Sequence, residues 1–328
     1  MPNSRQWRAS DARHAMYGAL RQFFQSLGYR EVETPAMVPA PGMEPHISAF
    51  SISYVPEMEA ASARTLYLHT SPEYAMKRLL ASGSGPIFQI CKVFRNGELS
   101  AAHNPEFSLL EFYRTGADYR AIMSDLERAL AEAERAIGRT GLFGQLPYQR
   151  LPVREAVLER TGVDLRLCSD AASLHAAAKK AGIAAPNAIS FEDLFFHLFL
   201  QKVEPELGRD RPTYLVDYPP SMASLARLKP GDAQVAERFE LYVHGAELAN
   251  GFSELTDAAE QRRRLLQEQA LRRASGKPVY PLDERFLEAV TELPPCAGVA
   301  VGLDRVLMLL LGAQSIEEVL LFPAREFL

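Results

Sequence analysis

Residues 88–113 most constrain the fold, because two apolar runs there flank a polar, turn-rich segment. The runs, residues 88–94 and 107–113, contain alternating bulky side chains that favour β-strands. The pattern therefore predicts an antiparallel hairpin with a long loop. Such a loop would place four side chains around one ligand: Arg95, His103, Asn104 and Phe107.

This loop has the chemistry to bind a nucleotide and an acid. An arginine that follows a strand can hold a carboxylate or phosphate through two parallel hydrogen bonds, and an aromatic ring offers a base a flat stacking surface. Taken singly, a loop arginine is usually solvated and Phe107 would usually be core. The whole string, FRNxEx5NPEFxxLEFY, resembles motif 2 of the class II aminoacyl-tRNA synthetases in the form carried by the lysyl branch.

Size and composition allow a large core and disfavour several classes of protein. The chain has 328 residues, of which 47% are hydrophobic and 23% charged, so it could form one large domain or two smaller ones. Its net charge of −5 does not indicate a globally basic nucleic-acid binder. Cys91, Cys168 and Cys296 have neither zinc nor disulfide spacing, as is usual in a reducing cytosol. Without a secretory h-region or an apolar run near the roughly 20 residues that span a bilayer, we expect a cytoplasmic protein and no membrane.

The N-terminal third predicts a helix, a strand and a second helix. Ser10 can cap a helix over residues 11–26, and Gly28, a strand and Pro35 follow, a unit that resembles class II motif 1 and implies a homodimer. Residues 39–63, rich in Pro, Ser, Ala and Gly, predict a mobile loop before a short strand at 66–69. Helix capping explains Ser71, Pro72 and Glu73, and the resemblance adds substrate binding, with Glu73 on the α-amino group.

A second hairpin is predicted over residues 239–249, turning at His244 and Gly245. Glu247 and Glu254 follow, and two carboxylates beside a triphosphate can hold Mg²⁺ while the phosphates complete its octahedron. An exposed acidic strand end is the alternative explanation. The string AELANGFSELTD resembles the lysyl-type ExxNGFxEL, which implies that Glu247 serves metal and ATP. The resemblance also implies that Glu254 binds metal and, with Tyr113, the side-chain ammonium of the substrate.

Two further segments complete the pattern. Residues 139–212 predict a helical insert, and the arginines of residues 262–273 predict a solvated helix face or, alternatively, a docking site for an acidic partner. Near the C-terminus a strand at 299–301, Gly302 and a helix from Asp304 resemble class II motif 3, which implies that Arg305 contacts the γ-phosphate of ATP. Glycine at such a turn lets the backbone approach a nucleotide.

The resemblance runs from about residue 10 to the C-terminus and implies an α+β class II catalytic domain, an antiparallel sheet flanked by helices. We expect residues 1–328 to form this single domain, with no room for the N-terminal anticodon-binding OB-fold of roughly 150 residues. A stand-alone core is similar to the lysyl-tRNA synthetase paralogues that modify translation elongation factor P. One departure lies in motif 2, where Gly97 replaces the usual glutamate and Glu98 follows.

The resemblance implies a ligase that uses ATP and Mg²⁺ to activate lysine or (R)-β-lysine as an adenylate, and then transfers it to a lysine side chain of elongation factor P. Arg95 and Arg305 would be catalytic, and tRNA would not be the main substrate. Three alternatives remain open: a truncated synthetase that acylates tRNA or RNA, an inactive paralogue that binds a partner, and an adenylating enzyme for free amino acids or amines. The implied ATP-binding residues are Arg95, Asn96, Asn104, Phe107, Glu247, Leu248, Gly302 and Arg305.

Overall fold

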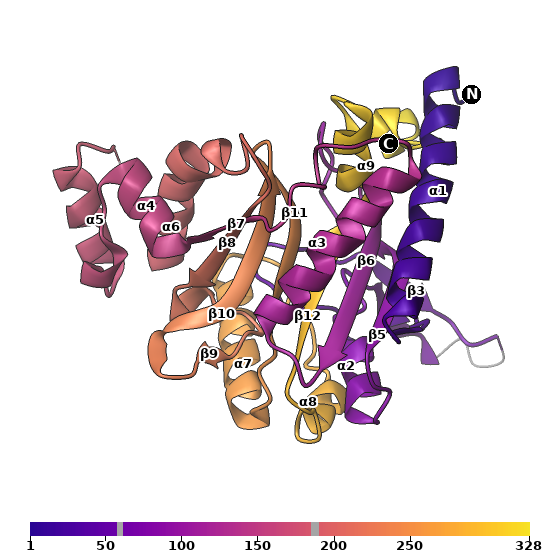
Figure 1. The fold of residues 1–328 in the computed structure, drawn as a ribbon. Coiled ribbons are helices and arrows are strands. Elements are labelled where there is room, and N and C mark those ends of the chain that lie inside the picture. The colour runs from indigo at the N-terminus through magenta and orange to yellow at the C-terminus, as the bar shows by residue number, and fades with distance from the viewer. Residues whose placement is uncertain (58–61, 185–189) are drawn as a thin grey trace.

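The main sheet carries most of the predicted site residues. The computed structural model describes residues 1–57, 62–184 and 190–328 (Figure 1). The central strands pair antiparallel, whereas β1 and β7 lie parallel to their neighbours at the two edges. In spatial order the strands are β1 (Arg30–Glu31), β5 (Ile87–Phe94), β6 (Glu106–Thr115), β12 (Cys296–Gly302), β11 (Ala246–Ser253), β10 (Asp232–Val243), β8 (Thr213–Tyr218) and β7 (Gln149–Pro152), with β9 (Leu228–Lys229) also paired to β10.

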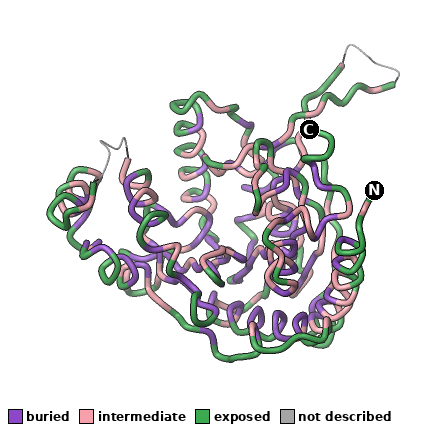
Figure 2. Tube along the Cα trace, turned by 90° about the horizontal axis from the view of Figure 1, so that it is seen from above, coloured by how far each residue is buried: buried purple, intermediate pink, exposed green. Residues whose placement is uncertain are grey.

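Helices cover both faces of this sheet. On β6, Leu110 and Phe112 enter the large apolar core formed with α1 (Ser4–Ser26), α3 (Tyr119–Ala136) and α9 (Leu303–Leu311). Tyr113 points the other way, toward α2 (Glu73–Ala81), because neighbouring strand residues face opposite sides. On that second side α7 (Ala258–Ala274) and α8 (Glu284–Val290) form a further cluster. The buried residues concentrate between these layers (Figure 2), and the α+β prediction is confirmed.

A small second sheet corrects one expectation. It consists of β2 (Met37–Val38), β4 (Arg64–Leu68) and β3 (Ser51–Tyr54). The prediction of a loop throughout residues 39–63 is therefore wrong for β3, whose Ser51–Tyr54 pairs with β4; residues 58–61 lie outside the described ranges. The polar composition of β3 reflects its position at a sheet edge, where three of its four residues are exposed.

The helical insert has an apolar core of its own. It contains α4 (Val153–Thr161), α5 (Ala171–Lys180) and α6 (Phe191–Leu198), with short helical turns at Leu165–Leu167, Phe199–Val203 and Glu204–Glu206. Its apolar cluster joins the main sheet through Leu215, Tyr218 and Tyr242. Most of the regular structure in residues 139–212 is helical, although the region first adds β7 to the sheet edge.

Helix α1 begins earlier than the sequence predicts. Asn3, not Ser10, is its cap: the Asn3 side chain accepts hydrogen bonds from the amides of Arg5 and Gln6, and the Gln6 side chain accepts one from the Asn3 amide. Asp118 and Asp257 cap α3 and α7 through their side chains. No helix within the described residues is long and apolar enough to cross a membrane. Short 3₁₀ helices occupy Pro220–Met222, Ile316–Glu318 and Ala324–Glu326.

Candidate active site

A β-bulge lets Glu247 and Glu254 share one face of the sheet although their positions differ by seven, an odd number. In the β10–β11 pairing Leu241 pairs with Ala249 and Tyr242 with Glu247, so Leu248 is the extra residue. Both Leu248 and Ala249 enter the main core. Strict alternation would place the two glutamates on opposite faces. The bulge therefore directs both carboxylates to the side occupied by α2.

Lys77 joins two of the predicted substrate residues. Its Nζ lies 2.5 Å from Glu73 Oε1, one helical turn earlier on α2, and 2.5 Å from Glu254 Oε2. The Lys77 side chain is 2% exposed and lies over the Phe252 ring at 5.1 Å. Burying a charge in this way is costly without partners. The network therefore brings Glu73 and Glu254, distant in sequence, together around one ammonium group.

Glu111 occupies the centre of the same space. Tyr113 Oη donates to Glu111 Oε1 at 2.6 Å, and Ser71 Oγ donates to Glu111 Oε2 at 2.7 Å. The Tyr113 ring lies directly on β12, where a Cβ on Gly298 would come 2.2 Å from it. Only glycine leaves room for the ring there. Ser71 also accepts from the Glu73 amide at 3.1 Å, so its predicted helix-start role is combined with a contact in the site.

Burial and crowding of like charges raise several carboxyl pKa values in this space. Burial, followed by the charge of Glu73, raises the pKa of Glu111 to about 8, although hydrogen bonds from Tyr113 and Ser71 oppose the shift. Burial also raises the pKa of Glu254, an effect that Lys77 opposes. Burial, Glu44 and Glu73 together raise the pKa of Glu268 to about 8. The space is therefore short of positive charge, as expected for a pocket that binds cations.

We expect the ligand-free protein to lose stability as pH rises from 6 to 9. The folded-state pKa of Glu111 is about 8 against an ordinary value of 4.5, so its stabilising contribution is full below 4.5 and is lost as pH rises through 8. A melting temperature that falls across this pH range would support the raised pKa of Glu111. Glu111→Gln should flatten the fall, because glutamine does not titrate. A parallel fall in both proteins would contradict it.

The other end of the site contains guanidinium groups. Arg95 lies over the Phe107 ring, 5.0 Å from its centroid, so the guanidinium covers one face of the ring that is predicted to stack on adenine. Glu98 Oε1 is 3.7 Å from Arg95 Nη1, and Gly97 adopts a φ of 89° that favours glycine. The departure from the family motif thus forms a turn that brings Glu98 beside Arg95.

Arg305 connects the two predicted hairpins. Its Nη1 donates to the Glu247 carbonyl at 2.7 Å, and its Nη2 contacts His103 Nε2. Burial and the charge of Arg305 lower the pKa of His103, so the ring is neutral and accepts this hydrogen bond. A Cβ on Gly302 would lie 3.8 Å from the Leu248 carbonyl and 4.0 Å from Arg305 Cδ. These residues therefore surround one region, as the sequence predicts.

For four other predicted residues, the structure shows burial or contacts within the protein that do not by themselves indicate ligand binding. The Asn104 side chain accepts from the Ala324 amide and donates to the Glu106 carbonyl, so it connects the loop to the C-terminal segment. The side chains of Leu248 and Pro72 are buried, which leaves only their backbone for a ligand. Asn96 is exposed, and its amide donates to the Ser48 carbonyl at 2.7 Å. Their binding roles remain predictions.

The predicted magnesium site is incomplete in protein atoms alone. No group of three or more His, Cys, Asp and Glu side chains in the described part of the chain could hold a metal. Glu254 Oε1 is buried without a hydrogen-bond partner, which suits a cation, but Oε2 already pairs with Lys77. The charges that act most strongly on Glu247 are those of Glu240, Arg305 and Arg238 instead. The two glutamates thus face different partners.

Sequence reasoning missed two residues that the structure places at the centre of the site. Glu111 carried a signal, since a carboxylate within the apolar run 107–113 is rare at a buried strand position. Lys77 carried a weaker one, because its spacing of four residues from Glu73 suits any surface ion pair. Its second partner, Glu254, is far away in the sequence, so no local pattern indicated the burial.

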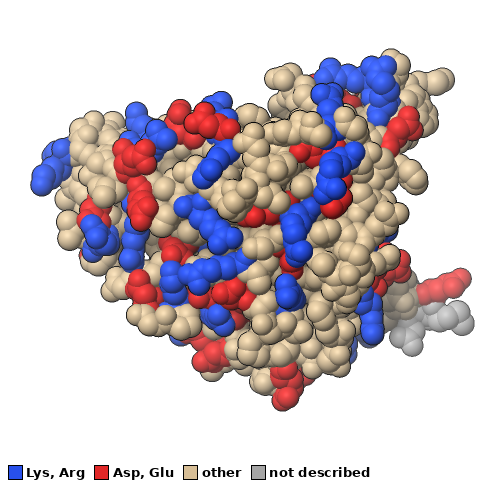
Figure 3. Space-filling model, viewed as in Figure 1, with Lys and Arg blue, Asp and Glu red and all other residues tan. Residues whose placement is uncertain are grey.

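Most arginines of α7 form hydrogen bonds or ion pairs with other groups of the protein. Arg264 Nη1 donates to the Ser224 and Ala226 carbonyls, and Arg272, 0% exposed, donates to three other carbonyls. Arg262 and Arg263 pair with glutamates, and Arg273 is exposed. The predicted solvated face is therefore wrong for Arg272. On the face shown in Figure 3, basic and acidic side chains are interspersed rather than gathered by sign.

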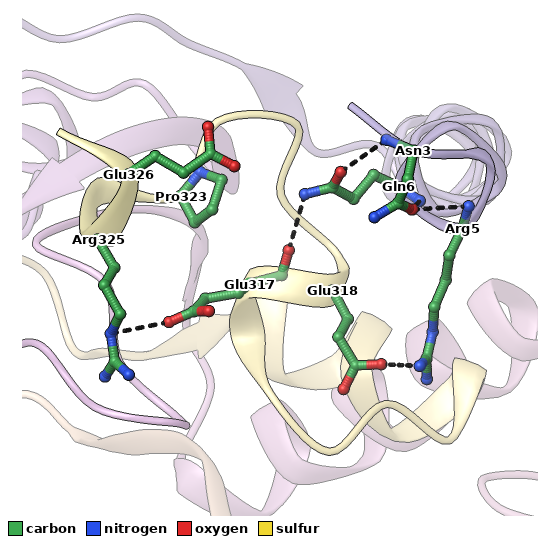
Figure 4. Close-up of a pocket in the computed structure, with 8 residues that line it drawn as sticks. All are labelled: Asn3, Arg5, Gln6, Glu317, Glu318, Pro323, Arg325 and Glu326. Carbon is green, nitrogen blue, oxygen red and sulfur yellow. Dashed lines mark hydrogen bonds and ion pairs between the residues drawn. The ribbon is translucent and has the colours of Figure 1, made fainter. Parts of the chain in front are cut away.

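A separate cavity lies between the start of α1 and the C-terminal residues (Figure 4). Four of its charged side chains are already paired, Arg325 with Glu317 at 3.0 Å and Arg5 with Glu318. Gln6 Nε2 donates to the Glu317 carbonyl, which joins the two ends of the chain. The cavity carries none of the predicted site residues, and its polar groups are explained by this junction.

Comparisons with known proteins show what the chain is similar to. A family model described as tRNA synthetases class II (D, K and N) matches residues 3–326. The chain is 43% identical over 316 residues to an elongation factor P–(R)-β-lysine ligase of Klebsiella pneumoniae subsp. pneumoniae, covering 94% of this chain and 93% of the relative. A protein of the same name from Salmonella typhi is 41% identical over 313 residues with the same coverage. One from Pectobacterium carotovorum subsp. carotovorum is 43% identical over 316 residues, again covering 94% and 93%.

Proposed function

The chain belongs to the class II tRNA synthetases of the D, K and N group, and from this membership we propose that it is an ATP-dependent ligase that activates (R)-β-lysine or lysine. The activated residue is then transferred to a lysine side chain of elongation factor P. The observation that carries the proposal is the cluster of buried carboxylates around Lys77, together with the arginines Arg95 and Arg305 near Glu247. A diamino acid has two ammonium groups and one carboxylate to match it.

In the first step an oxygen of the substrate carboxylate attacks the α-phosphorus of ATP. The bond from phosphorus to the bridging oxygen breaks, and pyrophosphate leaves. Arg95 neutralises the carboxylate and α-phosphate, and Arg305 the terminal phosphate, while Phe107 stacks on adenine. Arg305 first has to exchange its contacts with His103 and the Glu247 carbonyl for phosphate oxygens.

In the second step the neutral amine of the acceptor lysine attacks the acyl carbon. The carbon–oxygen bond to AMP breaks, and the amine proton passes to solvent. Glu73, Tyr113 and Glu254 hold the ammonium groups throughout, with Ser71 and Pro72 beside them. Mg²⁺, which Glu247 is better placed to hold than the Lys77-paired Glu254, would supply charge neutralisation for the phosphates.

The acceptor decides between the proposal and its nearest alternative. We expect the wild-type protein to catalyse lysine-dependent or β-lysine-dependent ATP–pyrophosphate exchange and to label elongation factor P but not tRNA. Labelled substrate, ATP and Mg²⁺ would be incubated with each acceptor in parallel. Labelled tRNA with unlabelled factor would show a tRNA-acylating enzyme. Pyrophosphate exchange without transfer of label to either acceptor would favour a small-molecule adenylating enzyme. Absence of exchange would indicate an inactive paralogue.

Two further features belong to the proposal. A homodimer through α1 and β1 follows from the motif 1 resemblance, and exposed Trp7 and Leu27 on this segment, 55% and 39% accessible, would be covered. A cytoplasmic location follows from the acceptor, since a translation factor works there. Analytical ultracentrifugation tests the first point: a monomer at micromolar concentration would reject it.

A further inference from the structure

Glu44 brings an additional carboxylate to the site from a segment not used so far. Its Oε2 is buried without a hydrogen-bond partner, and the charges that act on it most are Glu73, Arg95 and Arg272. Burial and Glu73 raise its pKa, whereas a hydrogen bond from its own backbone amide and the two arginines lower it. Glu44 is therefore close enough to feel the charges of Glu73, proposed to bind an amino group, and of Arg95, proposed to bind the carboxylate.

The backbone around Glu44 is fixed from two sides. Arg272 Nη1, from the end of α7, donates to the Glu44 and Ile47 carbonyls at 2.7 Å each. The Ser48 carbonyl accepts from the Asn96 amide at 2.7 Å, which holds the segment against the loop that carries Arg95. A backbone segment held by these hydrogen bonds can present the Glu44 side chain in one orientation.

Gly42 makes room for the carboxylate. A Cβ at Gly42 would come 2.4 Å from Glu44 Oε2 and 3.1 Å from Thr70 Oγ1, next to the start of α2. The oxygen is therefore folded back over Gly42 toward the segment that carries Ser71 and Glu73. No donor within the described residues satisfies this oxygen, so a ligand ammonium is the group that its position suits.

We propose that Glu44 is a specificity-determining residue that binds, together with Glu73, the substrate ammonium nearest the carboxylate. The inference rests on the proposed function. Glu73 alone is a weak partner for that ammonium, because Glu73 Oε1 already pairs with Lys77 at 2.5 Å. Glu44 supplies negative charge that Lys77 does not neutralise, and it approaches from a different element, so two carboxylates enclose the amino group.

A ligand lacking that amine provides the test. Isothermal titration calorimetry would compare lysine and (R)-β-lysine with 6-aminohexanoate, which keeps the carboxylate and the distal ammonium. We expect Glu44→Gln to weaken binding of the diamino acids at least tenfold and that of 6-aminohexanoate less than twofold. Gly42→Ala should act in the same direction by displacing the carboxylate.

Glu288→Gln, at an exposed position on α8, is the matched control and should bind all ligands as the wild type does. Equal weakening of all ligands by Glu44→Gln would show a role in loop structure only, and unchanged binding would remove Glu44 from the site; either result overturns the inference. Because binding is measured directly, the test is independent of turnover. Failure of pyrophosphate exchange in the wild type would reject the proposed function instead.

Discussion

Glu254→Gln is expected to reduce lysine-dependent pyrophosphate exchange by a factor of roughly 30 to several thousand. The carboxylate is 1% exposed, lies 2.5 Å from Lys77, and has Oε1 without a hydrogen-bond donor. Removing one member of a buried charge pair costs about 2–5 kcal/mol, and glutamine keeps the shape while it loses the charge. In the variant, one carboxylate fewer would offset the repulsion between the substrate ammonium and the Lys77 ammonium.

The kinetic pattern identifies the cause. The loss should appear mainly as a higher KM for the diamino acid, with the KM for ATP changed less than twofold, because Arg305 and Glu247 lie at the other end of the site. Glu288→Gln should retain wild-type rates. Near-normal exchange by Glu254→Gln would refute the assignment of this carboxylate to substrate binding.

The local elements of the site were predictable because each has a short-range cause. The strands that contain Arg95 and Tyr113 follow from alternating apolar side chains, and β5 and β6 pair over the predicted residues. The turn at His244 and Gly245 has positive φ at both residues, as the hairpin interpretation expects. Such features depend on neighbours in sequence, and sequence patterns report those neighbours.

The arrangement of charge within the site was not predictable in the same way. Whether Glu247 and Glu254 share a face depends on the bulge at Leu248, and no residue there signals a bulge. Arg272 belongs to a run that reads as solvated, yet the packing of α7 on the Glu44 segment buries it completely. Both outcomes result from tertiary packing, which overrides local preference.

Lys77→Met is expected to destabilise the ligand-free protein by about 3–5 kcal/mol, because it leaves Glu73 and Glu254 without their shared ammonium. Methionine fills a similar volume beside Phe252, so lost packing contributes little. Urea unfolding followed by circular dichroism would measure the change. The loss should be greater at pH 8 than at pH 6, since burial raises the pKa of Glu254 and protonation relieves the unpaired charge at lower pH.

The double variant Lys77→Met with Glu254→Gln separates charge from packing. If the cost comes from an unpaired buried carboxylate, neutralising Glu254 should restore at least half of the lost stability and most of the pH difference. If the two changes add without restoration, Lys77 contributes through packing alone. In that case the buried ammonium does not balance the carboxylates, and the argument that this pocket requires a second cationic group from its substrate loses its basis.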